Sequence, residues 1–106
     1  MNKLFLSWVQ ENESLLNKMG IKTEYNFQWD TPAHALNPST VIDQETSLCV
    51  GRVIVWSTKQ MHFEVFLLES ESIEPILIKD VELDEGVNFY NILEEYFKIM
   101  VTGTSE

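Results

Sequence analysis

The chain has 106 residues, of which 44% are hydrophobic, and its formal net charge is −10 at pH 7. This length fits one domain with a modest core, and the composition is that of a globular protein. The acidic balance argues against binding to nucleic acid, and no apolar run reaches the roughly 20 residues of a membrane-spanning helix.

Two features of the sequence favour a cytoplasmic location. The single cysteine, Cys49, lies in an apolar run and has no partner for an intrachain disulfide, which fits a reducing compartment. The N-terminal residues lack an apolar core of signal-peptide length, because charges return at Glu11 and Glu13.

Acidic residues are concentrated in the second half of the chain. Between Glu64 and Glu95 the only basic residue is Lys79. Solubility is the ordinary interpretation of such a charge excess. The alternative is attraction to a basic partner, since a field of one sign raises association rates by roughly 10- to 1000-fold.

The first predicted element is an amphipathic helix over residues 3–19. Gly20 is expected to end this helix, because glycine tolerates the left-handed conformation found at helix ends. The apolar residues that recur at helical spacing are Leu4, Phe5, Trp8, Val9, Leu15, Leu16 and Met19.

Extended segments come next in the chain. Pro32 and Pro38 place a loop after the first of them, because proline cannot donate to a strand ladder. Short connections between the others predict antiparallel neighbours, since a parallel crossover needs about a dozen residues or more. The predicted strands are at about 23–29, 40–45, 48–57, 61–69 and 75–82.

A second helix is predicted over about 85–101, with Asp84 as its N-cap and a frayed tail at 102–106. Two apolar-striped helices need a shared surface, and one face of the sheet supplies it. The sequence therefore predicts a single domain over 1–106 of the α+β class. Its expected architecture is an antiparallel four- to five-stranded meander sheet with the N-terminal and C-terminal helices packed on one face.

The hairpin formed by the third and fourth predicted strands is apolar on both faces. A two-residue turn would pair Trp56 with Met61 and place Arg52 among the core residues. A three-residue turn at 57–59 pairs Val55 with Met61 instead. Burying an unpaired charge is the costlier error, so the three-residue turn is expected. The face away from the helices then carries Arg52, Ile54, Trp56, His62, Glu64, Phe66 and Leu68.

Large apolar residues mixed with a few charges are typical of a protein-binding surface, where Trp and Arg often carry the binding energy. The alternative is that Ile54, Trp56 and Phe66 lie beneath the proline-containing loop or at a contact with a second copy of the chain.

No residue pattern assembles a reaction centre or a cofactor site. His34 and His62 are the only histidines and do not stand at metal-ligand spacing, and Cys49 is expected to be a small buried hydrophobe. The glycines do not form a phosphate-binding loop. The sequence thus predicts a binding protein without metal or cofactor. A small enzyme is the minor alternative, which loss of function on mutating His34 or Cys49 would support.

The order of these elements resembles the TriTu family of bacterial immunity proteins, from about Leu4 to Met100. Four segments carry the resemblance: "LFLSWVQENESLLNKMG", "NPSTVIDQETSLCVGRVIVW", "FEVFLLES" and "ILEEYFKIM". The turn at 57–59 departs from the pattern because it contains no glycine. The most telling residues are Gly51, Arg52, Trp56, Glu64 and Val65.

The resemblance implies a cytoplasmic antidote that binds a toxin and has no catalytic motif of its own. The implied partner is an ADP-ribosyltransferase toxin that modifies elongation factor Tu, bound as a 1:1 heterodimer with its NAD or substrate cleft occluded. Glu64 is expected to meet basic groups of that cleft and to pair with Arg52 across the strands. The predicted partner-binding residues are Trp56, Glu64, Arg52, Ile54, His62, Phe66 and Asp43.

The other functional class that fits these features is a small acidic chaperone for a secreted effector. Such a chaperone would use a sticky face to hold an extended, nonglobular segment. An immunity protein protects cells against one folded toxin domain, whereas a chaperone raises effector levels.

Overall fold

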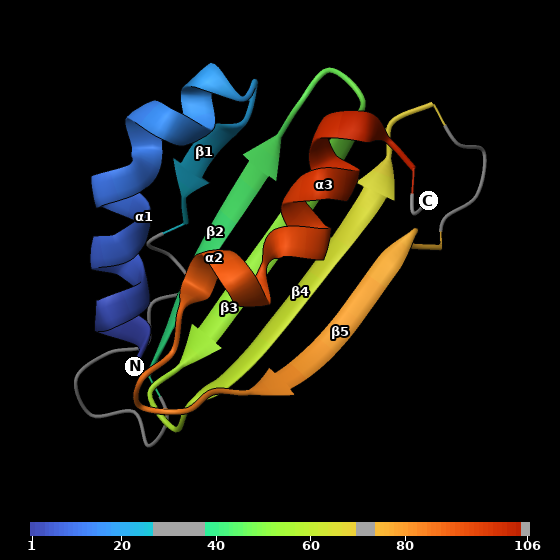
Figure 1. The fold of residues 1–106 in the computed structure, drawn as a ribbon. Helices are drawn as coiled ribbons and strands as arrows, with labels where there is room; N and C mark the ends of the chain where they lie inside the picture. Colours follow the sequence, from blue (N-terminus) through green and yellow to red (C-terminus); the bar gives the residue numbers. More distant parts are fainter. Residues whose placement is uncertain (27–37, 70–73, 105–106) are drawn as a thin grey trace.

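The computed structural model describes residues 1–26, 38–69 and 74–104, and within them one antiparallel sheet carries the helices on a single face (Figure 1). Strand order follows the chain, β1-β2-β3-β4-β5, with every neighbouring pair antiparallel. The predicted α+β fold class is confirmed. The elements are α1 (Asn2–Lys18), β1 (Lys22–Tyr25), β2 (Ser39–Glu45), β3 (Cys49–Trp56), β4 (Gln60–Leu67), β5 (Leu77–Glu82), α2 (Phe89–Ile92) and α3 (Glu94–Thr102).

Helix α1 lies over the β1–β3 side of the sheet, whereas α3 crosses β3 and β4 (Figure 1). Strand β5 is one of the two edge strands, with β1 at the other edge, and its residues are exposed or half-buried. Within the described ranges, no helix combines the length and apolarity needed to cross a membrane.

Helix α1 buries a narrower stripe than its sequence suggested. Leu4 and Leu15 are 53% and 50% exposed. Each lies one residue before a buried position, which is about 100° around the helix. Gly20 ends the helix with a φ of +88°, and the Ile21 N–H donates to the Leu16 carbonyl at 2.9 Å. The buried residues of α1 are Phe5, Val9 and Leu16.

The C-terminal helical segment is divided, where one helix was expected over about 85–101. Leu93 separates α2 from α3 with backbone angles of φ −95° and ψ 9°. The N-cap is Asn88, whose side-chain oxygen accepts the Asn91 N–H at 3.1 Å. Asp84 was the expected cap, but it begins a turn in which its carbonyl accepts the Val87 N–H.

The core lies between the helices and the inner face of the sheet. Gly51 allows the Tyr96 ring to approach β3, because a Cβ at that position would lie 2.5 Å from the Tyr96 hydroxyl oxygen. That hydroxyl donates to the Gln44 side-chain oxygen at 2.9 Å, and the Gln44 amide donates to the Thr23 hydroxyl at 2.9 Å. The buried side chains of β3 and β4 that pack here are Val53, Val55, Met61, Phe63 and Val65.

The β3–β4 hairpin has the predicted register, with Val55 opposite Met61. The Lys59 N–H donates to the Trp56 carbonyl at 3.1 Å, and Lys59 has a φ of +72°. A left-handed residue at the third turn position is the usual way to close a three-residue hairpin loop, although glycine normally occupies it. The turn therefore has the usual left-handed conformation at its third position, with Lys59 in place of glycine.

Candidate functional site

The face of the sheet opposite the helices, called here the outer face, gathers the predicted site residues. Side chains directly opposite each other in an antiparallel pair point to the same face. Asp43 lies opposite Arg52, which lies opposite Glu64, and Ile54 lies opposite His62. In Figure 1 the helices lie in front of the sheet, so the outer face is turned away from the viewer. The structure thus places Asp43, Arg52, Ile54, Trp56, His62, Glu64 and Phe66 on one face.

Arg52 is held by Asp43 of the neighbouring strand. Its Nε donates to Asp43 Oδ1 at 2.7 Å and its Nη2 donates to Oδ2 at 3.3 Å, so the contact has two points. The hydrogen bond to Asp43 raises the pKa of Arg52. The expected cross-strand partner was Glu64, which does lie opposite Arg52, but the ion pair goes to the other neighbour. Both Arg52 and Asp43 are partly exposed, so the pair stays accessible to a binding partner.

His62 lies between two carboxylates. Its Nδ1 is 2.8 Å from Asp80 Oδ1 on β5, and its Nε2 is 3.1 Å from Glu64 Oε1 on its own strand. Partial burial lowers the pKa of His62, but the hydrogen bonds and charges of Asp80 and Glu64 outweigh it, and the net pKa is raised. The side chain of His62 is 17% exposed, whereas that of Asp80 is 81% exposed.

Asp80 and Glu82 are two carboxylates of β5 that were not among the predicted partner-binding residues. The register of β4 with β5 brings Asp80 opposite His62 and Glu82 opposite Gln60, which adds both carboxylates to the outer face. The alternation of charged residues in β5 was a visible signal. The pairing with His62 was not, because the length of the β4–β5 connection leaves the register open.

The outer face contains a concave region of about 580 Å³, called here the acidic hollow. Its ionisable residues come from β1, β2, β3 and β4, and carboxylates are in excess over cations there. Phe66 and Val50 supply its apolar part. The hollow is lined by Lys22, Thr23, Glu24, Asp43, Gln44, Glu45, Val50, Gly51, Arg52, Glu64 and Phe66.

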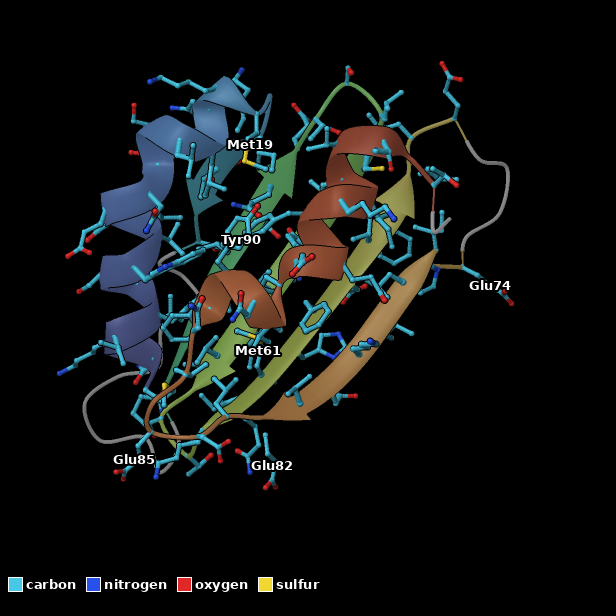
Figure 2. The ribbon with its side chains drawn as sticks, viewed as in Figure 1. Met19, Met61, Glu74, Glu82, Glu85 and Tyr90 are labelled. Carbon is cyan, nitrogen blue, oxygen red and sulfur yellow. The ribbon has the colours of Figure 1, made fainter. Side chains whose placement is uncertain are left out.

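A second concave region of about 410 Å³, called here the Trp56 hollow, lies toward the β3–β4 turn. Its one aromatic side chain, Trp56, is half-buried, and two carboxylates on β5 stand beside it. Figure 2 shows Glu82 at the same end of the molecule as Glu85, near the turn. The hollow is lined by Trp56, Gln60, Met61, Asp80, Val81 and Glu82.

Cys49 does not belong to this face. Its side chain is fully buried and its thiol donates to the Ile99 carbonyl at 3.4 Å, on the helix side of the sheet. Burial raises the pKa of the Cys49 thiol, so it is a poor nucleophile. The sheet separates it from His62. In the described ranges no group of His, Cys, Asp and Glu side chains could hold a metal ion.

Some expectations lie outside the described residues. The segment 27–37 includes His34, Pro32 and the predicted end of the first strand, and the structure describes none of it. The alternative in which the proline-containing loop lies over Ile54, Trp56 and Phe66 also falls on this segment.

A family model described as "Immunity protein TriTu" matches residues 3–99. No curated protein and no solved structure matched the chain. The matched range runs from α1 into α3 and contains every outer-face residue described above.

Proposed function

The chain belongs to the TriTu family of immunity proteins, and we propose that it neutralises an ADP-ribosyltransferase toxin acting on elongation factor Tu. Immunity proteins neutralise toxins, so the partner is a toxin protein. In the proposed complex, one copy of the chain places its outer face over the active cleft of one toxin domain. The site of action is the bacterial cytoplasm, where elongation factor Tu works.

The observation that carries this proposal is the composition of the outer face among the described residues. It combines a half-buried Trp56 with the accessible Arg52–Asp43 ion pair, and two hollows lie on either side of the row that contains Ile54 and His62. Trp and Arg side chains of this kind often carry most of the binding energy at protein interfaces. The helices cover the other face, which is used for the core.

Charge favours an NAD-binding cleft as the surface that is covered. A cleft that holds a pyrophosphate is expected to present basic groups, and the outer face offers the carboxylates of Glu64 and Glu24 with their neighbours in the acidic hollow. The formal net charge of −10 extends this attraction over the whole molecule. Inhibition then needs only binding, with the toxin's substrate excluded.

The test uses the cognate toxin domain, co-expressed in bacteria and purified for binding measurements. Trp56→Ala and Glu64→Lys are each expected to weaken binding at least about tenfold and to reduce protection. The matched controls are Leu15→Ala and Glu11→Lys, which change exposed positions on α1, on the helix-covered side of the sheet. Their affinity is expected to stay within about twofold of the wild type.

Three further readouts separate the alternatives. Light scattering is expected to give a 1:1 complex, and the complexed toxin is expected to lose NAD binding. Wild-type affinity in both outer-face variants would contradict the proposal. A raised level of toxin without protection would support the chaperone alternative instead.

A further inference from the structure

We propose that the outer face receives basic side chains of the toxin, one in each hollow, and that these side chains displace His62 from Asp80 and Glu64. This inference rests on the proposed function and adds the chemistry of the partner. It makes His62 an internal cation that occupies the site until the toxin's own cations replace it.

His62 connects the two hollows. Asp80 lines the Trp56 hollow, and Glu64 lines the acidic hollow. One imidazole ring reaches both carboxylates, with Nδ1 2.8 Å from Asp80 and Nε2 3.1 Å from Glu64. A change at either hollow therefore changes the surroundings of the same ring.

Both ring nitrogens of His62 face carboxylate oxygens. An ionised carboxylate can accept hydrogen bonds but cannot donate them. A neutral imidazole has one N–H donor and can satisfy one of the two carboxylates, whereas the imidazolium ion has two donors and satisfies both. The arrangement therefore favours the protonated ring, in agreement with the raised pKa of His62.

The charged groups around His62 come from several strands. Asp80 faces it from β5 and Glu64 from its own strand, with Glu82 further along β5. Beyond Glu64, Arg52 on β3 lies across from that carboxylate and is itself held by Asp43 of β2. A toxin cation that enters either hollow thus meets carboxylates that already contact His62 or Arg52 of this chain.

The lining of each hollow selects a basic side chain. In the Trp56 hollow an indole stands beside the carboxylates of Asp80 and Glu82, which suits a guanidinium through cation–π contact and charge-assisted hydrogen bonds. In the acidic hollow, the carboxylates exceed the cations Lys22 and Arg52. An anionic side chain would be repelled at both places.

Displacement of His62 couples binding to a proton. When a toxin cation takes over Asp80 or Glu64, the imidazolium loses the acceptors that stabilised it and its proton passes to solvent. The pKa of His62 is then lower in the complex than in the free protein. At pH values between the pKa of His62 in the complex and its pKa in the free protein, the affinity for the toxin must rise as the pH rises. Fewer protons then have to be released on binding.

The experiment measures this coupling on the chain alone, with a defined probe. The probe is the peptide acetyl-Arg-Ser-Arg-Ser-Arg-amide, whose alternate arginines share one side when the peptide is extended. The control peptide carries citrulline, which has the same shape without the charge. Two-dimensional NMR reports the peptide affinity, the Trp56 indole signal and the titration of the His62 ring.

The peptide is expected to shift the Trp56 and His62 signals and to bind about threefold more tightly at pH 7.5 than at pH 6.0. The His62 titration midpoint should fall on binding by the reciprocal amount, about half a pH unit. His62→Gln should bind at pH 6.0 as tightly as the wild type does at pH 7.5. His34→Gln should keep the wild-type pH dependence.

Signals that move elsewhere, equal binding of the citrulline peptide, or an unchanged pH dependence in His62→Gln would each overturn the inference. Should His62→Gln not fold, Asp80→Asn at an exposed position provides the second variant and is expected to reduce the pH dependence. Failure of this inference is distinguishable from failure of the proposed function. A toxin that binds the outer face without proton release contradicts only the inference, whereas a positive peptide result without toxin binding contradicts only the function.

Discussion

At the scale of single residues, Gly51 is the glycine at which an added Cβ meets the closest neighbours. It stands on the inner face of β3, and the Tyr96 hydroxyl and the Met100 sulfur occupy the space that a side chain would take. Tyr96 is fully buried, and its hydrogen bond to Gln44 fixes the ring. Glycine is needed at this position because the Tyr96 ring comes close to the backbone. The backbone angle is not the reason, since the φ of Gly51 is not positive.

Gly51→Ala is expected to destabilise the fold by about 2–3 kcal/mol, because overpacking forces Tyr96 or the strand to move. Thermal unfolding should show a midpoint lower by roughly 10 °C. Gly86→Ala is the matched control, since a Cβ at Gly86 has nothing within 4 Å. Equal unfolding midpoints for the two variants would show that the Tyr96 side chain can move aside without loss of stability.

At the scale of elements, the two caps considered for the C-terminal helices can be told apart by mutation. Asn88→Ala is expected to cost about 1 kcal/mol, because its side chain caps α2 by accepting the Asn91 N–H. Asp84→Ala is expected to change stability by less than about 0.5 kcal/mol, since Asp84 is exposed and its turn uses a backbone carbonyl. Urea unfolding measures the free energy of unfolding of both variants. A larger loss of stability in Asp84→Ala would show that Asp84 is the N-cap, as the sequence predicted.

Much of the arrangement of elements followed from the sequence. The alternation in β3 and β4, together with the cost of burying Arg52, was sufficient to give the hairpin register and hence the face of every predicted site residue on those two strands. The sequence could not identify the N-cap of the C-terminal helical segment. Asp84 and Asn88 have about equal capping ability and lie only four residues apart.

Pairings across the sheet were the least predictable part of the site. Arg52 lies between two carboxylates, and strand alternation cannot say whether Asp43 or Glu64 receives its hydrogen bonds. The contribution of Asp80 to the site depends on the β4–β5 register, which the sequence leaves open. Residue types therefore gave the face, whereas the choice of partners needed the structure.

At the scale of the whole molecule, charge is expected to govern how fast the toxin is captured. With a formal net charge of −10, the association rate constant should fall roughly tenfold or more between low salt and 0.5 M NaCl. Stopped-flow mixing with the toxin domain measures it. Trp56→Ala serves as the contrast, because loss of an anchor should raise the dissociation rate and leave the salt dependence of association unchanged. A salt-independent association rate would show that the acidity serves solubility alone.

The alternation of buried and half-buried positions along β3 and β4 has an evolutionary consequence. Residues that form the core and residues that lie on the outer face are separate sets, although they are neighbours in the sequence. If the outer face binds the toxin as proposed, recognition can diverge by single substitutions there while the core packing is kept. A library varied at positions 54, 56 and 66, with proline and glycine excluded, should remain largely folded and should contain variants with altered toxin preference.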